Sequence, residues 1–169
     1  MKQICYPKWI DSTPVKSGLF KQTQIDARQK LKENGIPKKT FEAWRLTNST
    51  LLAEFFSLPL NSNQEKLKLK KISDLKPNSV KLIFKSERSF IANLSNDIEE
   101  LDEKEIKSHL SNNSNSTNNN YDFNKTINEA SNHQLIGLRI KGKVKKSLEI
   151  SIQASLDELI PTRIIIIVE

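Results

Sequence analysis

The sequence predicts an α+β protein, because its first and last thirds carry apolar residues at two different spacings. Leu19, Thr23, Ala27 and Leu31 recur every four residues, which places them on one face of an α-helix. Beyond residue 133, short runs rich in β-branched residues alternate with polar ones, a pattern typical of β-strands. With 169 residues, the chain is long enough to bury a core of its own.

The first helix is expected to follow an irregular segment over residues 1–13. Thr13 followed by Pro14 fits a helix start, since proline is tolerated at the first helical position. Gly18 weakens the first turn, so the stable part of the helix should begin just after it. Gly35 suits the left-handed position that often follows a helix, and it predicts an end at residue 34.

Two further short helices are expected over residues 40–46 and 50–56. Residues 47–50 read Thr-Asn-Ser-Thr and supply capping side chains for the second of these helices. That helix also has an apolar face, which comprises Leu51, Leu52, Phe55 and Phe56.

A β-hairpin is expected next. Residues 79–84 and 90–92 are short apolar runs, and the polar residues 85–89 between them suit a turn. The acidic segment 97–107 that follows should be helical in part.

The later chain predicts a polar loop, one more helix and a series of strands. Residues 111–120 consist of Ser, Thr and Asn alone and cannot bury apolar area, so they should form a disordered loop. Residues 121–130 show helical spacing. Strands are then expected in four stretches: 135–140, 142–144, 148–152 and 163–168. This pattern divides the chain into three parts: a helical and hairpin domain (1–110), the Asn-rich loop (111–120), and a helix with further strands (121–169).

The composition is basic, with a formal net charge of +7 and a pI near 9.4. Such a balance suits a nucleic acid, an anionic surface or an acidic protein partner. However, Lys, Ile and Asn are all abundant and share A/T-rich codons, so a codon bias alone can produce this charge. A small basic module that binds RNA or an acidic protein partner therefore stays an alternative.

The cysteine and histidine content offers no recognisable metal or catalytic site. Cys5 is the single cysteine, which excludes an internal disulfide and a cage of Cys ligands. His109 and His133 are far apart in sequence, and no further ligands accompany either of them. No phosphate-binding Gly-rich loop, nucleophile elbow or paired catalytic carboxylate is recognisable. We expect a protein that is not an enzyme and has no catalytic, cofactor-binding or metal-binding residue.

Three groups of charged or aromatic residues have an ordinary surface or packing role as their first interpretation and a binding role as the alternative. Glu42 and Arg45 are spaced for a helix-surface ion pair, and Trp44 beside them either packs in the helical core or anchors a partner. The Lys-rich stretch 66–71 either protects a strand edge or binds phosphates. The same alternatives apply to a second lysine group, which comprises Lys141, Lys143, Lys145 and Lys146.

Three segments carry motifs of one known family, in the same order along the chain. Residues 34–47 read N-G-I-P-K-K-T-F-E-A-W-R-L-T, beside the family signature G-L-P…E-A-W-R-Y-T. Residues 79–95 match its hairpin L-V-F…G-x-F that leads into L-S, without the turn glycine. Residues 123–168 match its entry into a β-helix, with Lys141 where the family has proline. The chain thus resembles the SufB/SufD family of scaffold proteins for iron–sulfur cluster assembly, and most closely the N-terminal portion of its SufD branch.

The resemblance implies a fold, a role and partners. The N-terminal helical domain and hairpin would lead into the first strands of a right-handed parallel β-helix. The role would be that of a cytoplasmic scaffold component of the SufBCD complex, with SufB and the SufC ATPase as partners and neither membrane nor nucleic acid expected. The full complex handles Fe–S clusters, but the family's cluster-building residues lie in the later β-helix, so none is carried over to this chain.

A truncated chain is also expected from the resemblance. A solenoid normally needs about three stacked repeats for stability, and the chain stops in what would be the first coils. The run Ile164–Val168 would then leave an apolar strand edge that invites pairing with another chain.

Overall fold

The computed structural model describes seven stretches of the chain: residues 5–37, 45–60, 78–85, 89–113, 121–131, 134–153 and 157–169. Together these stretches form helices and two small mixed sheets, so the predicted α+β class is confirmed. Contacts divide the chain into two compact units. Unit 1 comprises Met1–Leu60 and Thr117–His133, and unit 2 comprises Asn61–Ser116 and Gln134–Glu169.

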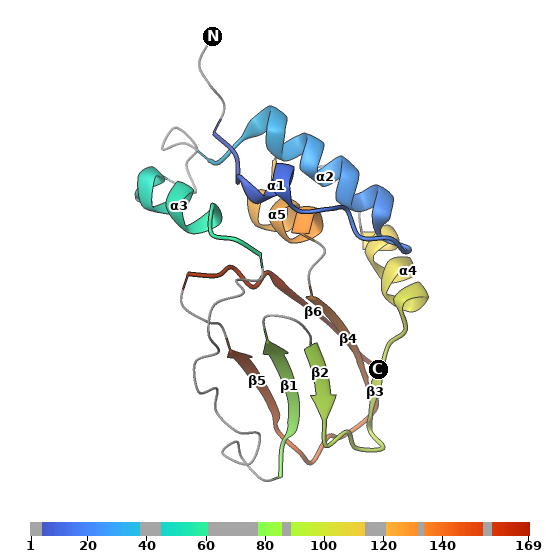
Figure 1. Ribbon diagram of the computed structural model, residues 1–169. Coiled ribbons are helices and arrows are strands. Elements are labelled where there is room, and N and C mark those ends of the chain that lie inside the picture. Colours follow the sequence, from blue (N-terminus) through green and yellow to red (C-terminus); the bar gives the residue numbers. More distant parts are fainter. Residues whose placement is uncertain are drawn as a thin grey trace. The chain divides into compact units, whose positions relative to one another are not determined.

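Unit 1 is helical within its described residues. Its helices are α1 (Trp9–Ser12), α2 (Lys21–Asn34), α3 (Ser49–Phe56) and α5 (Phe123–Ser131), and Figure 1 shows α2 lying against α5. The buried face of α5 follows the predicted spacing, with Phe123, Ile127 and Ala130 buried. The face predicted for α2 is correct only in part. Ala27 and Leu31 are buried, but Thr23 is half-buried and Leu19 precedes the helix and is 38% exposed, while Gln24 and Arg28 are buried instead.

The beginning of α2 differs from the sequence prediction. The helix starts at Lys21, and the predicted start at Thr13–Pro14 is wrong. Gly18 adopts a φ of 120°, which interrupts a helix, and the Lys16 amide instead donates a 2.7 Å hydrogen bond to the Gln24 side chain. The segment 1–13, predicted as irregular, contains the short helix α1, which buries Trp9 and Ile10.

Helix α3 begins where the capping residues predicted it. The Asn48 side chain accepts hydrogen bonds from the amides of Thr50 (3.0 Å) and Leu51 (3.4 Å), which stabilises the first turn. Phe56 packs edge-to-face on Phe123 with ring centroids 4.8 Å apart. A helix was also expected over residues 40–46. Its residues 40–44 lie outside the described stretches.

Unit 2 contains two three-stranded sheets (Figure 1). The strands are β1 (Val80–Lys85), β2 (Ser89–Ala92), β3 (Ile98–Glu100), β4 (Gln134–Ile140), β5 (Leu148–Gln153) and β6 (Thr162–Val168). One sheet has the order β2-β1-β5 and the other the order β3-β4-β6. In both, the central strand pairs antiparallel with one neighbour and parallel with the other.

The core of unit 2 joins residues from both sheets. Val80, Leu82 and Phe84 of β1 cluster with Ile136 and Leu138 of β4, and Ile98 of β3 completes the group. Each of these residues is at most 3% exposed. Successive side chains of a strand point to opposite faces, so every second residue of β1 and β4 reaches this cluster. In β1 the residues between them, Lys81 and Ile83, are buried as well.

Three features of unit 2 differ from the elements predicted from the sequence or were not predicted. The acidic segment is helical in part, as expected, since α4 spans Glu103–Asn113, but it also contains the unpredicted strand β3. Helix α4 extends into the Asn-rich stretch as far as residue 113, and the remainder of that stretch lies outside the described residues. The strand expected over 142–144 is wrong, because Gly142 has a φ of 66° and forms a turn between β4 and β5.

Candidate interaction surface

The candidate metal ligands do not assemble a site in the part of the chain that is described. Cys5 is exposed, His109 is half-buried in α4, and His133 lies outside the described residues. Among the described residues, no three His, Cys, Asp or Glu side chains are grouped so that they could hold a metal ion. A lone exposed thiol is not a ligand set for a metal or a cluster.

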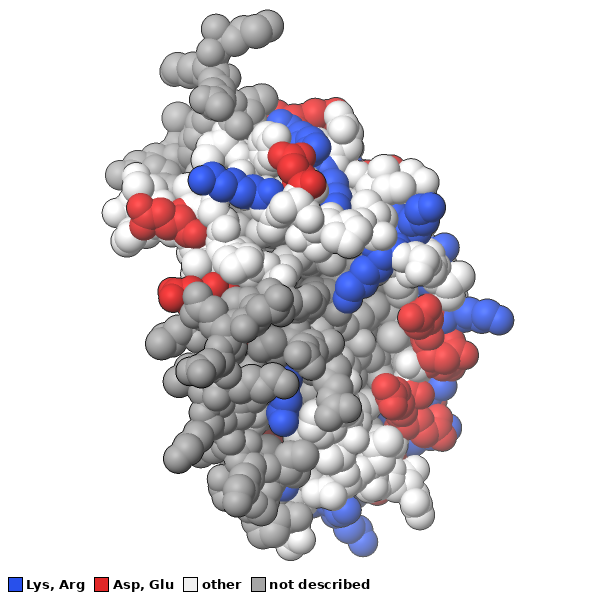
Figure 2. All heavy atoms as spheres, viewed as in Figure 1, with Lys and Arg blue, Asp and Glu red and all other residues white. Residues whose placement is uncertain are grey.

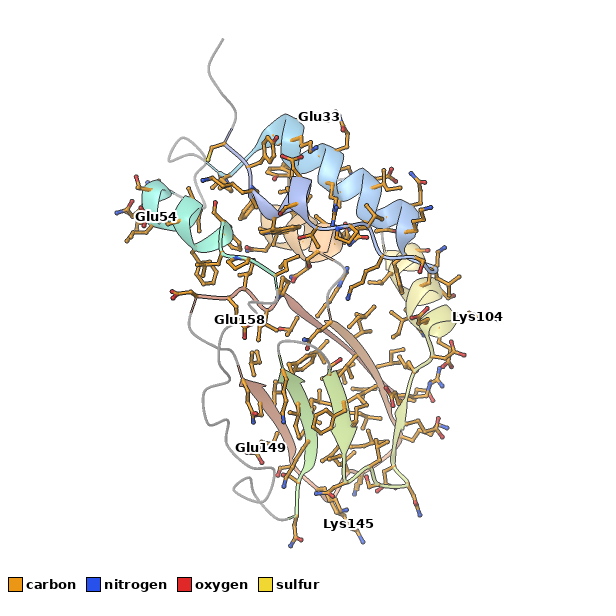
Figure 3. All side chains as sticks on the ribbon, viewed as in Figure 1. Glu33, Glu54, Lys104, Lys145, Glu149 and Glu158 are labelled. Carbon is orange, nitrogen blue, oxygen red and sulfur yellow. The ribbon has the colours of Figure 1, made fainter. Side chains whose placement is uncertain are left out.

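Of the other residues singled out in the sequence, some lie outside the described stretches and the rest are exposed. Glu42, Trp44 and the lysines of 66–71 lie outside the described stretches, while Arg45 is exposed in a turn before α3. The lysines of 141–146 are all exposed at the turn between β4 and β5, and in Figure 3 Lys145 projects from the end of the strands. The geometry therefore makes this turn a basic surface feature of unit 2.

The structure contains an ion-pair cluster around Arg139 that was not predicted from the sequence. Arg139 lies on β4 and its guanidinium contacts three carboxylates: Glu99 of β3 at 3.8 Å, Glu105 of α4 at 3.1 Å, and Glu169 at 3.0 Å. Figure 2 shows acidic side chains gathered on this side of unit 2, with basic ones beside them. The pKa of Arg139 is raised, chiefly by its hydrogen bond to Glu105. The cluster thus links β3, α4 and the residue after β6 to the central strand.

The carboxylate of Glu99 has a second cation beside it. Lys141 Nζ lies 2.7 Å from Glu99 Oε1, and this hydrogen bond is the main reason why the pKa of Glu99 is lowered. Because Lys141 is engaged in this way, the basic surface of the turn is carried mainly by the three lysines that follow it.

The two parallel-paired outer strands, β5 and β6, carry apolar side chains that face the core and are nevertheless exposed. In register, Ile150 of β5 is the partner of Leu82, and Ile166 of β6 is the partner of Leu138. Partners in register point to the same face of a sheet. Leu82 and Leu138 are 0% exposed, whereas Ile150 is 49% and Ile166 is 45% exposed.

The same contrast recurs one step further along β5, where Ile152 is 55% exposed although its partner Phe84 is fully buried. On β6 the next such residue, Val168, is 73% exposed, and its partner Ile140 is half-buried. Among the described strands, β5 and β6 each have a single neighbour. Ile150, Ile152, Ile166 and Val168, called the open-edge residues below, are therefore exposed on strands that have no second neighbour among the described residues. They form the strongest candidate for an interaction surface in unit 2.

Unit 1 has an apolar surface of its own on α3. Leu51 and Phe55 are 61% and 51% exposed, and the Phe55 ring also packs edge-to-face on that of Phe56, with centroids 5.1 Å apart. The apolar face expected from the sequence is thus split, since Leu52 and Phe56 are half-buried and the other two point outward.

Comparison with protein-family models, with curated proteins and with solved structures finds no match to this chain. Its function is therefore inferred from its own residues and geometry. One further observation concerns membranes: no helix in the described stretches combines the length and the apolar character that crossing a bilayer requires.

Proposed function

We propose that the chain is a SufD-like scaffold component of iron–sulfur cluster assembly, which acts by holding protein partners. The proposal starts from the motifs of residues 34–47, 79–95 and 123–168. The single structural observation that supports it most is the path of the chain through β4, β5 and β6.

Along that path, consecutive strands alternate between the two sheets. The chain leaves β4, crosses to the other sheet as β5, and returns as β6, which pairs parallel with β4 from Gln134↔Thr162 to Ile140↔Val168. Strand β5 pairs parallel with β1 in the same manner. In a parallel β-helix each coil brings the chain back in parallel register beside its own earlier strand, and the path through β4, β5 and β6 has this form. We therefore interpret β4, β5 and β6 as the first coil of a parallel β-helix.

A scaffold role also fits the chemistry of the described surface. Its most prominent features are apolar open-edge residues and ion pairs, which suit contacts between proteins. The Fe–S cluster would be cargo of the assembled complex, and the described residues of this chain offer no ligand set for it. In this proposal SufB and the SufC ATPase are the partners.

Co-purification tests the scaffold role directly. The tagged 169-residue chain would be produced together with SufB and SufC from the same source and passed over a size-exclusion column. We expect a complex with SufB that persists through the column. Recovery of the chain free of both partners, while its circular dichroism shows that it is folded, would contradict the proposal.

The basic turn favours one alternative, a module that binds RNA. Lys143, Lys145 and Lys146 are all exposed within this one short turn. When a protein contacts phosphates, the logarithm of its binding constant falls linearly with the logarithm of the salt concentration. The slope is close to the number of phosphates contacted. Titration of labelled RNA at several salt concentrations, with the wild-type chain and with the triple Lys→Gln variant, decides the question. Strong salt dependence that the variant loses would favour RNA binding over the scaffold role.

A further inference from the structure

Helix α4 has few apolar side chains with which to hold unit 2. Two of its 11 residues, Ile106 and Leu110, are large and apolar. Ile106 is 4% exposed and Leu110 is half-buried. Isolated helices shorter than about 12–15 residues are marginal in water, so α4 would lose its helical structure if it left the sheet. The folding of α4 therefore depends on its docking.

Gly137 of β4 provides the space into which Ile106 packs. A Cβ atom on Gly137 would lie 2.7 Å from Ile106 Cγ1 and 2.9 Å from Leu101 Cβ, so the strand accepts no side chain there. Leu101, which lies two residues before α4, is 4% exposed, and its amide donates a 2.9 Å hydrogen bond to the Gly137 carbonyl. The beginning of α4 thus meets β4 in one small apolar contact.

Glu105 makes two contacts, one with each carboxylate oxygen. Its Oε2 accepts a 3.0 Å hydrogen bond from the Asp102 amide, and the Asp102 side chain in turn accepts from the amides of Lys104 and Glu105, both at 2.8 Å. This reciprocal arrangement is a capping box, which stabilises the first turn of a helix. Glu105 Oε1 accepts a 3.1 Å hydrogen bond from the Arg139 guanidinium of β4. One side chain therefore joins the first turn of α4 to the sheet.

We propose that α4 is a releasable strap on β4, which undocks and unfolds as one unit while both sheets stay folded. Glu105 couples the two events, because the same carboxylate holds the first turn together and binds the sheet. Release uncovers Gly137 and the face of the sheet on which it lies. Ile165 of β6, the register partner of Gly137, is half-buried on that face. The strap thus controls the exposure of an apolar face.

The sheets keep their own contacts when α4 leaves. The buried residues of the core cluster come from β1, β3 and β4. Arg139 also keeps two carboxylates, Glu99 at 3.8 Å and Glu169 at 3.0 Å, so release leaves no guanidinium without a partner. The inference uses only the contacts of α4 and does not rest on the scaffold role.

Amide hydrogen exchange of the full chain, followed by mass spectrometry, measures the release. A segment that opens by itself exchanges faster than the strands that open only on global unfolding. After correction for intrinsic rates, we expect the amides of residues 107–113 to exchange at least about 100-fold faster than those of β4.

Three variants test the coupling through Glu105. Glu105→Ala removes both contacts and should accelerate exchange in α4 about tenfold, with β4 unchanged. Glu105→Gln can still close the capping box and loses only the charge, so we expect about a threefold acceleration. Glu99→Ala is the matched control, because it removes another carboxylate from Arg139 but lies on β3. It should leave exchange in α4 within about twofold of the wild type.

Thiol labelling provides a second measurement that does not depend on the charged residues. In a Cys5→Ser background, Ile106→Cys places a buried thiol under the strap, and Leu138→Cys places one in the core, where Leu138 is 0% exposed. Both changes replace a large aliphatic side chain with the same smaller one. A thiol-specific reagent should modify the Ile106→Cys chain at least about 100-fold faster, because its thiol is exposed by local opening alone.

Three results would overturn the proposal. The first is exchange of the α4 and β4 amides at the same rate, and the second is equal labelling of the two cysteine variants. Either would mean that α4 opens only when the whole of unit 2 unfolds. The third is an acceleration of α4 exchange by Glu99→Ala as large as that by Glu105→Ala, which would remove the coupling role of Glu105.

Discussion

Replacing Arg28 with methionine should strongly destabilise unit 1. The Arg28 guanidinium is buried and donates hydrogen bonds to four backbone carbonyls. These belong to Ala130 (3.1 Å), Ile10 (3.2 Å), Thr13 (2.6 Å) and Pro14 (3.4 Å). Ala130 lies in the last turn of α5, where carbonyls have no partner within the helix. Arg28 therefore caps α5 and fixes the segment between α1 and α2 at the same time.

The size of the effect follows from these contacts. A hydrogen bond that involves a charged group contributes about 1.5–3 kcal/mol, and a buried carbonyl left without a donor costs about 1–3 kcal/mol. Burial also lowers the pKa of Arg28, which reflects a desolvation cost that methionine avoids. The net loss is therefore smaller than the sum of the bonds. Two of the bonds, those to the carbonyls of Ala130 and Ile10, are buried, and at about 1–3 kcal/mol for each carbonyl left without a donor we expect about 3–5 kcal/mol in all. That is a large part of the roughly 5–15 kcal/mol of an ordinary domain.

Urea unfolding monitored by circular dichroism measures this loss. Lys30→Met on the same helix is the matched control, because it removes the same charge from an exposed position and should change the free energy of unfolding by no more than about 0.5 kcal/mol. Arg28→Lys should fall between the two, since one ammonium group cannot reach carbonyls in several directions. A loss below about 1 kcal/mol for Arg28→Met would refute the capping role.

Three further substitutions test other contacts. Gly137→Ala should cost about 1–3 kcal/mol in thermal unfolding, because the added Cβ would lie 2.7 Å from Ile106 Cγ1; an unchanged melting temperature would contradict this packing. Tyr121→Phe removes a 3.0 Å hydrogen bond to a backbone carbonyl and should cost about 1 kcal/mol. Burial raises the pKa of Tyr121, so its neutral form stabilises the folded state below about pH 10 and this contribution is lost as the pH rises further; the variant should lack that alkaline loss. Glu99 has a lowered pKa, so its contribution is present above its ordinary value of 4.5 and is lost as the pH falls through the folded-state pKa. Glu99→Gln should therefore flatten the acid side of a melting-temperature profile, and a profile as steep as that of the wild type would count against this.

Elements governed by local spacing could be predicted from the sequence. The four-residue spacing of Ala27 and Leu31 placed one face of α2 in the core, and Asn48 marked the beginning of α3. The apolar runs of residues 79–92 similarly identified β1 and β2. In each case the signal lies within a few residues of the element, so no tertiary contact was needed to see it.

Features that depend on distant contacts could not be predicted in this way. Gly18 indicated that the stable part of α2 begins after it, but the contacts of the Gln24 and Arg28 side chains with the preceding segment could not be seen in the sequence. The parallel pairing of β1 with β5 joins residues far apart in sequence, and nothing local in either strand specifies its partner. The three carboxylates around Arg139 likewise come from separate elements, so the cluster exists only once the sheet has formed.

The open-edge residues show that neighbouring strands, and not composition, decide which apolar side chains are buried. Similar side-chain types are buried on the central strands and about half exposed on β5 and β6, so the difference arises from their neighbours. A further coil of a parallel β-helix would supply such a neighbour as a parallel strand in register, which is why these residues fit the proposed scaffold fold.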